Sequence, residues 1–145
     1  MVITAHTNAA AEVGLAACAA EGSVIGLVWD MTDARATARG LLKLYDLVDN
    51  TPTESEEALI QVLCSAGAVE AVVAAMRGHP EDRDVQSHGM RDLSHLMFRP
   101  SAGESALTLS RAKAAASATA AAQRRHRSDK LVCGAALLAF YAILR

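Results

Sequence analysis

The sequence predicts an all-helical chain that is built from a repeated unit. Apolar residues make up 52% of its 145 residues and charged residues 21%, which provides enough apolar side chain to bury a core. Only 3% of the residues are aromatic, three are proline, and alanine is abundant. Alanine favours helices, whereas β-branched and aromatic residues favour strands. The length suits one domain or one short array, so residues 1–145 are treated as a single unit.

A repeated helix begins at Gly22 and again at Gly67. The segments GSVIGLVWDM (22–31) and GAVEAVVAAM (67–76) both place apolar residues at positions i, i+3, i+4 and i+7. This spacing puts four apolar side chains on one face of a helix. The two segments are separated by a period of about 45 residues, which is typical of helical repeat proteins. We therefore expect a helix in each segment, packed in the same way.

A second helix follows each of these. The segment 36–48 aligns with 85–97, which matches Gly40 to Gly89 and Leu44 to Leu93. The same period continues into a third copy, where LVCGAALLAFYAIL (131–144) occupies the second-helix position. The first helix of this copy has only small side chains at the matching positions, which are Ala114, Ser117, Ala118 and Ala121. Because such side chains bury little apolar area, we expect the third layer to be the weakest.

A shorter helix precedes each pair of longer ones, at 10–22, at 56–67 and, more faintly, at 104–112. The approximate bounds of the three units are 7–50, 54–99 and 104–145. This unit resembles the armadillo repeat, above all in residues 66–97, which are similar to its second and third helices. The HEAT repeat has a similar period but two helices per unit, and the short glycine-ended helix favours the armadillo form. The resemblance implies an all-α armadillo-type α-solenoid, a right-handed superhelix of about three repeats with a degenerate third.

The same resemblance implies that the chain holds a protein or peptide partner. In armadillo arrays the third helices line a concave groove in which extended peptides or partner domains bind, since stacked units leave one long continuous surface. The partner-binding residues that this register implies on the concave face are Leu42, Asp46, Arg91, His95, Ala136 and Phe140. Peptide-binding members often carry Trp and Asn at these positions, so contacts in this groove must use other side chains.

No sequence motif indicates catalysis or a cofactor. The chain has no GxSxG, GxxxxGK[ST] or GxGxxG segment, so we expect that it is not an enzyme and binds no nucleotide. Cys18, Cys64 and Cys133 stand far apart, which argues against a disulfide framework and a zinc site and fits the reducing cytoplasm or nucleus. Cys64 and Cys133 occupy small-residue helix positions, which predicts that they pack in the core.

Three polar clusters have simple structural interpretations. His88, Asp92 and His95 lie at helical spacing, which favours a solvated face with local charge pairing over a metal site. The run RRHR (124–127) could bind phosphates, but it aligns with the loop at 79–82, which favours a solvated loop. The acidic run ESEE (54–57) opens a helix, where the helix dipole favours negative charge.

The partner class follows from charge and hydropathy. A net charge of −2 argues against global attraction to nucleic acid or anionic lipid, although surface contact through Arg124, Arg125 and Arg127 stays open as a weaker hypothesis. The apolar run 131–144 is shorter than the roughly 20 residues that span a bilayer. It ends without a polar closing helix, so self-association through this helix, or a longer array, also stays open. The leading hypothesis is a protein interaction scaffold. The alternative is a regulatory or oligomerisation segment of a larger protein, such as an enzyme, with no binding activity of its own.

Overall fold

The computed structural model describes residues 32–65, 67–97 and 106–144, and every regular element in these ranges is a helix. The helices are α3 (Ala34–Asp49), α4 (Thr53–Ser65), α5 (Ala68–Gly78), α6 (Arg83–Met97), α7 (Ala106–Arg125) and α8 (Lys130–Leu144). The all-α prediction is thereby confirmed for the described ranges. The helices predicted over 10–22 and 22–31, and Cys18, lie outside the described residues.

Short polar residues and one glycine set where these helices begin. The carboxylate of Asp33 accepts a hydrogen bond from the N–H of Arg35, and that of Asp82 accepts one from the N–H of Val85, so both cap a helix N-terminus. Asp129 accepts from two N–H groups of the first turn of α8 in the same way. Gly67 separates α4 from α5 with a positive φ of 88°, a conformation that glycine adopts without steric penalty.

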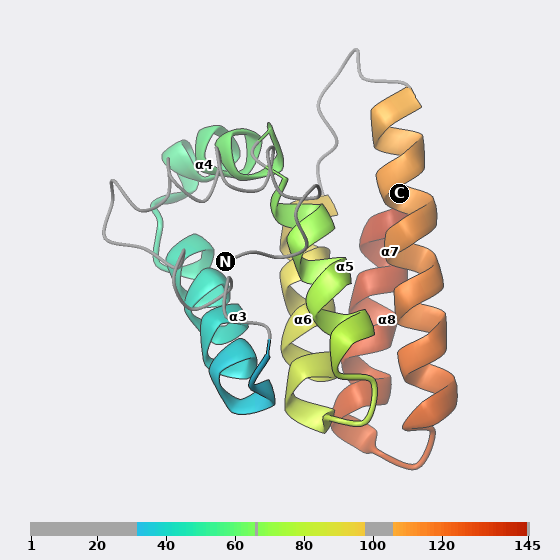
Figure 1. Cartoon of the computed structure of the whole chain (residues 1–145). Coiled ribbons are helices and arrows are strands. Elements are labelled where there is room, and N and C mark those ends of the chain that lie inside the picture. The colour runs from blue at the N-terminus through green and yellow to red at the C-terminus, as the bar shows by residue number, and fades with distance from the viewer. Residues whose placement is uncertain (1–31, 66, 98–105, 145) are drawn as a thin grey trace.

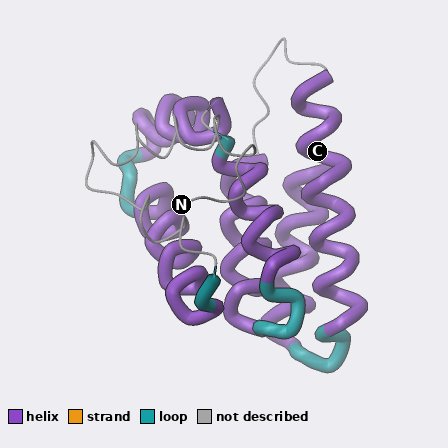
Figure 2. Tube along the Cα trace, in the orientation of Figure 1, coloured by secondary structure: helices purple, strands orange, loops and turns teal. Residues whose placement is uncertain are grey.

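The helices form two layers (Figure 1). In one layer α3, α6 and α8 lie side by side in that order and run in the same direction. In the other layer α5 packs against α6 and α7, α7 packs against α8, and both run the opposite way. The α5–α6 and α7–α8 connections therefore lie at the same end of the molecule (Figure 2), while α4 crosses over the opposite end.

The core lies between the layers and changes in character along them. Around α3 to α6 it contains fully buried large side chains, among them Leu41, Leu63, Val72, Met90 and Leu93. Around α7 and α8 the buried residues are mainly alanines, together with Val132. Small side chains contribute less apolar burial per residue, in keeping with the weaker third layer expected from the sequence.

The third unit differs from the prediction in one respect. The short helix expected over 104–112 is not a separate element. Its described residues form the first part of α7, which runs without a break from Ala106 to Arg125. The physical reason is composition: α7 contains neither glycine nor proline, whereas Gly67 interrupts the corresponding stretch of the second unit. In the described part of the third unit, residues 106–144, the chain therefore forms two long helices, α7 and α8.

The sequence predicts no membrane-spanning helix, and the length and hydropathy of each described helix can be compared with that expectation. Within the described ranges no single helix is both long and apolar enough to cross a bilayer. Only α4 and α5 taken together reach that length and hydropathy, and they are bent by 66° at their break.

Candidate partner-binding groove

A groove of about 320 Å³ lies where α4, α6 and α8 meet, and it is called the α4–α6–α8 groove below. Its lining residues are Thr53, Glu56, Glu57, Ile60, Ser94, His95, Leu138, Tyr141 and Ala142. This volume falls within the range of roughly 300–1,000 Å³ that is usual for ligand pockets. The groove is thus large enough to take one or two side chains of a partner.

Helical periodicity explains how each wall is made. The α4 wall uses Thr53, Glu56, Glu57 and Ile60, which recur at i, i+3, i+4 and i+7 and so share one helix face. The α8 wall uses Leu138, Tyr141 and Ala142, again at i, i+3 and i+4. Ser94 and His95 are the part of the lining that α6 contributes. Three helices therefore each present one stripe to the same groove.

The α8 wall belongs to a larger exposed apolar stripe. Leu137, Leu138, Tyr141 and Leu144 are respectively 69%, 56%, 59% and 80% exposed. Leu138 matches Leu93 in the repeat register, yet Leu93 is fully buried. The difference arises because α6 packs between α3 and α8, whereas α8 has α6 and α7 as its principal neighbours. An exposed run of large apolar side chains marks a surface that can bind another molecule.

The opposite wall is acidic. Glu54 and Glu56 lie in the first turn of α4, where the helix dipole favours negative charge, as expected for the run 54–57. Glu56 and Glu57 face the groove, and neither has an ion-pair partner among the described residues. The groove therefore combines an apolar wall on α8 with an uncompensated negative wall on α4.

The structure places the predicted concave-face residues on α3, α6 and α8, but only His95 lines the groove. Leu42 and Asp46 on α3 are exposed, and Arg91 on α6 is half-buried. The ring of His95 meets that of Tyr45 edge-on, with centroids 4.8 Å apart and planes at 78°, an arrangement favoured by aromatic electrostatics. This contact orients His95 at the junction of α3 and α6.

One of the two predictions on α8 requires correction. Ala136 is fully buried, so it cannot contact a partner, whereas Phe140 is half-buried, packs against the core and stays a prediction. The repeat alignment matches Ala136 to Arg91 and Phe140 to His95. However, α8 buries a different face from α6, because its alanines lie toward α6 and α7. The residues missed by the register are Leu138 and Tyr141. Their signal was available in the apolar run itself, since its four alanines share one helix face whereas Leu137, Leu138, Tyr141 and Leu144 share another.

The polar face of α6 also differs from expectation. Asp92 is buried, and neither carboxylate oxygen has a hydrogen-bond partner within the described residues, so this is not the solvated face that the sequence predicted. Burial, and then the negative charge of Asp46, raise the pKa of Asp92 well above its ordinary value. Burial lowers the pKa of His88 even though Asp84 acts in the opposite direction. No set of three or more potential ligands is positioned to hold a metal ion in the described ranges.

The two described cysteines are half-buried. Cys64 packs against the core, as predicted, and its Sγ lies 3.6 Å from the carbonyl oxygen of Leu96. Cys133 instead sits near the α7–α8 turn, with Sγ 3.4 Å from the carbonyl oxygen of Arg127. Neither thiol lines the groove.

The comparison of this chain with family models, with curated proteins and with solved structures finds no match. Nothing in these comparisons identifies an armadillo repeat, so that resemblance stays a prediction from the sequence pattern.

Proposed function

We propose that this chain binds a protein partner in the α4–α6–α8 groove and acts as a scaffold rather than as an enzyme. The observation that carries the proposal is the exposure of Leu138 and Tyr141 beside the acidic wall of α4. Large apolar side chains that stay in water weaken solubility unless a partner covers them. Because both side chains line a groove, a side chain of the partner can insert between the α4 and α8 walls and contact them.

The arrangement of the helices supports an interaction scaffold of the armadillo type. α3, α6 and α8 carry three copies of one sequence pattern, and they lie side by side and parallel. Units stacked in this manner bury their apolar faces against their neighbours and leave a continuous surface for binding. The right-handed superhelix and the armadillo classification are part of this proposal.

The two walls of the groove define the chemistry of the partner. The apolar wall fits an aliphatic or aromatic side chain, and Glu56 and Glu57 favour a cation nearby. We therefore propose a peptide segment in which a large apolar residue is flanked by Lys or Arg. The tyrosine ring of Tyr141 can supply both apolar contact and, for a cation, attraction to its π face.

A random peptide library, selected against the immobilised chain, tests this proposal. The enriched peptides are expected to combine a large apolar residue with flanking Lys or Arg. The substitution Glu57→Lys is expected to weaken their binding by roughly tenfold, measured by fluorescence anisotropy, because it reverses a charge in the groove. The matched control is Glu54→Lys, on the same exposed helix turn but outside the groove lining. No enrichment, or equal effects of the two substitutions, would contradict the proposal.

A second function is favoured by a different observation. Leu137 and Leu144 are the most exposed apolar side chains of α8, and they lie outside the groove lining. They favour self-association, which corresponds to the alternative of an oligomerisation segment. Light scattering across a concentration series measures the mass directly. A dimer that Leu137→Glu dissociates would support this function, whereas a monomer at about 100 μM, well above typical dimer dissociation constants, would contradict it.

A further inference from the structure

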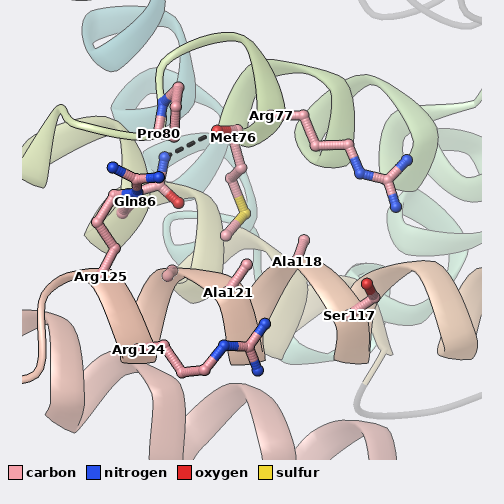
Figure 3. Close-up of a pocket in the computed structure, with 10 residues that line it drawn as sticks. Met76, Arg77, Pro80, Gln86, Ser117, Ala118, Ala121, Arg124 and Arg125 are labelled. Atoms are coloured by element: carbon pink, nitrogen blue, oxygen red, sulfur yellow. Dashed lines mark hydrogen bonds between the residues drawn. The ribbon is translucent and has the colours of Figure 1, made fainter.

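A second hollow, of about 500 Å³, lies between α5 and α7 at the end opposite to α4, and it is called the α5–α7 cavity below. Its lining residues are Met76, Arg77, Pro80, Gln86, Ser117, Ala118, Ala121, Ala122, Arg124 and Arg125. Figure 3 shows Met76 reaching from α5 toward Ala118 and Ala121 of α7. The cavity shares no residue with the α4–α6–α8 groove.

The sequence explains why a hollow exists here. The third unit has Ser117, Ala118 and Ala121 where the second unit has Val72, Val73 and Met76. Protein interiors are normally close-packed, so side chains this small leave space that the opposing helix does not fill. The volume is typical of sites that hold a small organic molecule.

The charge of the lining is of one sign. Arg77, Arg124 and Arg125 border the cavity, and no acidic side chain lines it. Arg77 and Arg124 stand in the last turns of α5 and α7, where positive charge offsets the helix dipole. Both residues are among those that line the cavity, and Figure 3 shows Arg77 extending from α5 and Arg124 running along α7. Neither has an ion-pair partner among the described residues, so both are available to an anion.

Beside the cavity, contacts tie the α5–α6 connection to the α7–α8 connection. Arg125 forms an ion pair with Glu81, and Arg83 forms one with Asp129. Nε2 of His126 lies 2.9 Å from the carbonyl oxygen of Pro80. These three contacts join the α5–α6 and α7–α8 loops, so a ligand would not have to order them. Preorganisation of this kind lowers the free-energy cost of binding.

We propose that the α5–α7 cavity binds a small organic phosphate. Guanidinium groups recognise phosphate through paired, charge-assisted hydrogen bonds, and the alanines with Met76 supply an apolar floor for the organic part of the ligand. The run RRHR contributes through Arg124 and Arg125, whereas Arg127 does not line the cavity. This site is independent of the proposed partner groove, and each can fail without the other.

Phenyl phosphate is the probe that tests the proposal, with amide chemical-shift changes in a titrated NMR spectrum as the measurement. Chemical-shift changes are expected to centre on α5 and α7. Phenyl phosphate is expected to bind more tightly than phenol, which lacks the phosphate group, and than inorganic phosphate, which lacks the apolar ring. Arg124→Gln and Arg77→Gln are each expected to weaken binding by at least roughly fivefold. Ala121→Phe is expected to abolish it by filling the space, and this exposed helix position tolerates the larger residue.

The matched control is Arg127→Gln, from the same basic run but outside the lining. It is expected to leave the affinity within about twofold, because its side chain is exposed and lies outside the lining, where physiological salt screens its charge. Equal weakening by Arg127→Gln and Arg124→Gln would overturn the proposal in favour of nonspecific attraction to basic residues. Affinity for phenyl phosphate no greater than that for inorganic phosphate would overturn it as well. Circular dichroism of each variant separates loss of binding from loss of folding.

Discussion

Gly89 of α6 lies directly against Met76 of α5. A Cβ atom added at position 89 would fall 2.6 Å from Cγ and 2.8 Å from Sδ of Met76, and 3.6 Å from a methyl group of Val72. The absence of a side chain at this position lets the two helices approach closely. It also lets Met76 extend across the interface to the α5–α7 cavity, which it lines.

Gly89→Ala is therefore expected to destabilise the chain. Real Cβ atoms do not approach other atoms this closely, so Met76 must move, and overpacking of a core typically costs about 1–3 kcal/mol. The open space of the cavity gives Met76 somewhere to go, which favours the lower part of that range. Urea unfolding measures the loss. A variant as stable as the original chain would show that the contact imposes no constraint.

Gly134→Ala is expected to act in the opposite direction. Gly134 is the repeat counterpart of Gly89, but a Cβ at this position meets no atom within 4 Å. It lies exposed inside α8, where alanine is favoured over glycine by about 0.5–1 kcal/mol. The midpoint of urea unfolding should rise. A fall would mean that the exposed face of α8 is more closely packed than the structure shows.

These two glycines show what a repeat pattern can and cannot predict. The pattern correctly predicted the helices over 36–48, 56–67, 67–76, 85–97 and 131–144, because periodicity and the break at Gly67 are local properties of the chain. It could not predict that equivalent positions differ in burial, since burial depends on the number of neighbouring helices. Ala136 is buried and Leu138 exposed for that reason.

The same limit applies to the candidate site. His95 lines the groove, but the α4 wall, with Glu56 and Glu57, could not be foreseen from positions in the third helices alone. Asp92 stands in a polar stripe that sequence reasoning assigns to solvent, and tertiary packing buries it. A polar stripe predicts exposure only when no other element packs against it.

Asp92 is expected to make stability depend on pH. Because its folded-state pKa is raised, the folded chain favours the protonated carboxyl group. Its destabilising effect is absent below the ordinary carboxyl pKa of 3.8, grows as pH rises through that value and becomes constant above the raised folded pKa. Asp92→Asn removes this dependence, and an unsatisfied buried group costs about 1–3 kcal/mol.

The measurement is the difference in unfolding free energy between Asp92→Asn and the original chain at about pH 4, 6 and 8. This difference should increase with pH in favour of the variant. His88 has a lowered pKa, so its own effect makes stability rise with pH up to its ordinary value of 6.5. Its contribution cancels in the difference, because both chains retain it. Parallel curves would show that Asp92 is ionised without penalty.

Arg111 is expected to hold α7 to the α4–α5 junction. Its Nε donates to Oε2 of Glu70 and its Nη2 to the carbonyl oxygen of Cys64, both at 2.8 Å, and the side chain is buried. Lysine has one ammonium group and cannot reproduce this forked geometry. Arg111→Lys should therefore cost about 1–2 kcal/mol in urea unfolding. The exposed Arg127→Lys is the control, and equal effects of both would show that Arg111 contributes charge alone.

Gln86 gives the sharpest test of the α5–α6 connection. Its buried Nε2 donates to the carbonyl oxygens of Met76, at 2.9 Å, and His79, at 2.8 Å, and so satisfies two groups at the C-terminal end of α5.

Gln86→Met keeps the volume but loses both hydrogen bonds, at a cost of about 1–3 kcal/mol. Gln86→Glu should be worse near neutral pH, since an ionised carboxylate cannot donate and faces two carbonyl oxygens without compensation. Lowering the pH should reduce the deficit of the glutamate variant, because a protonated carboxyl group can donate to one of those oxygens, while the methionine variant should show no such recovery. Unfolding midpoints of both variants across pH measure this difference. An equal pH response in the two would mean that the side chain at position 86 turns away from the carbonyl groups and that the loop is held by its contacts with the α7–α8 turn alone.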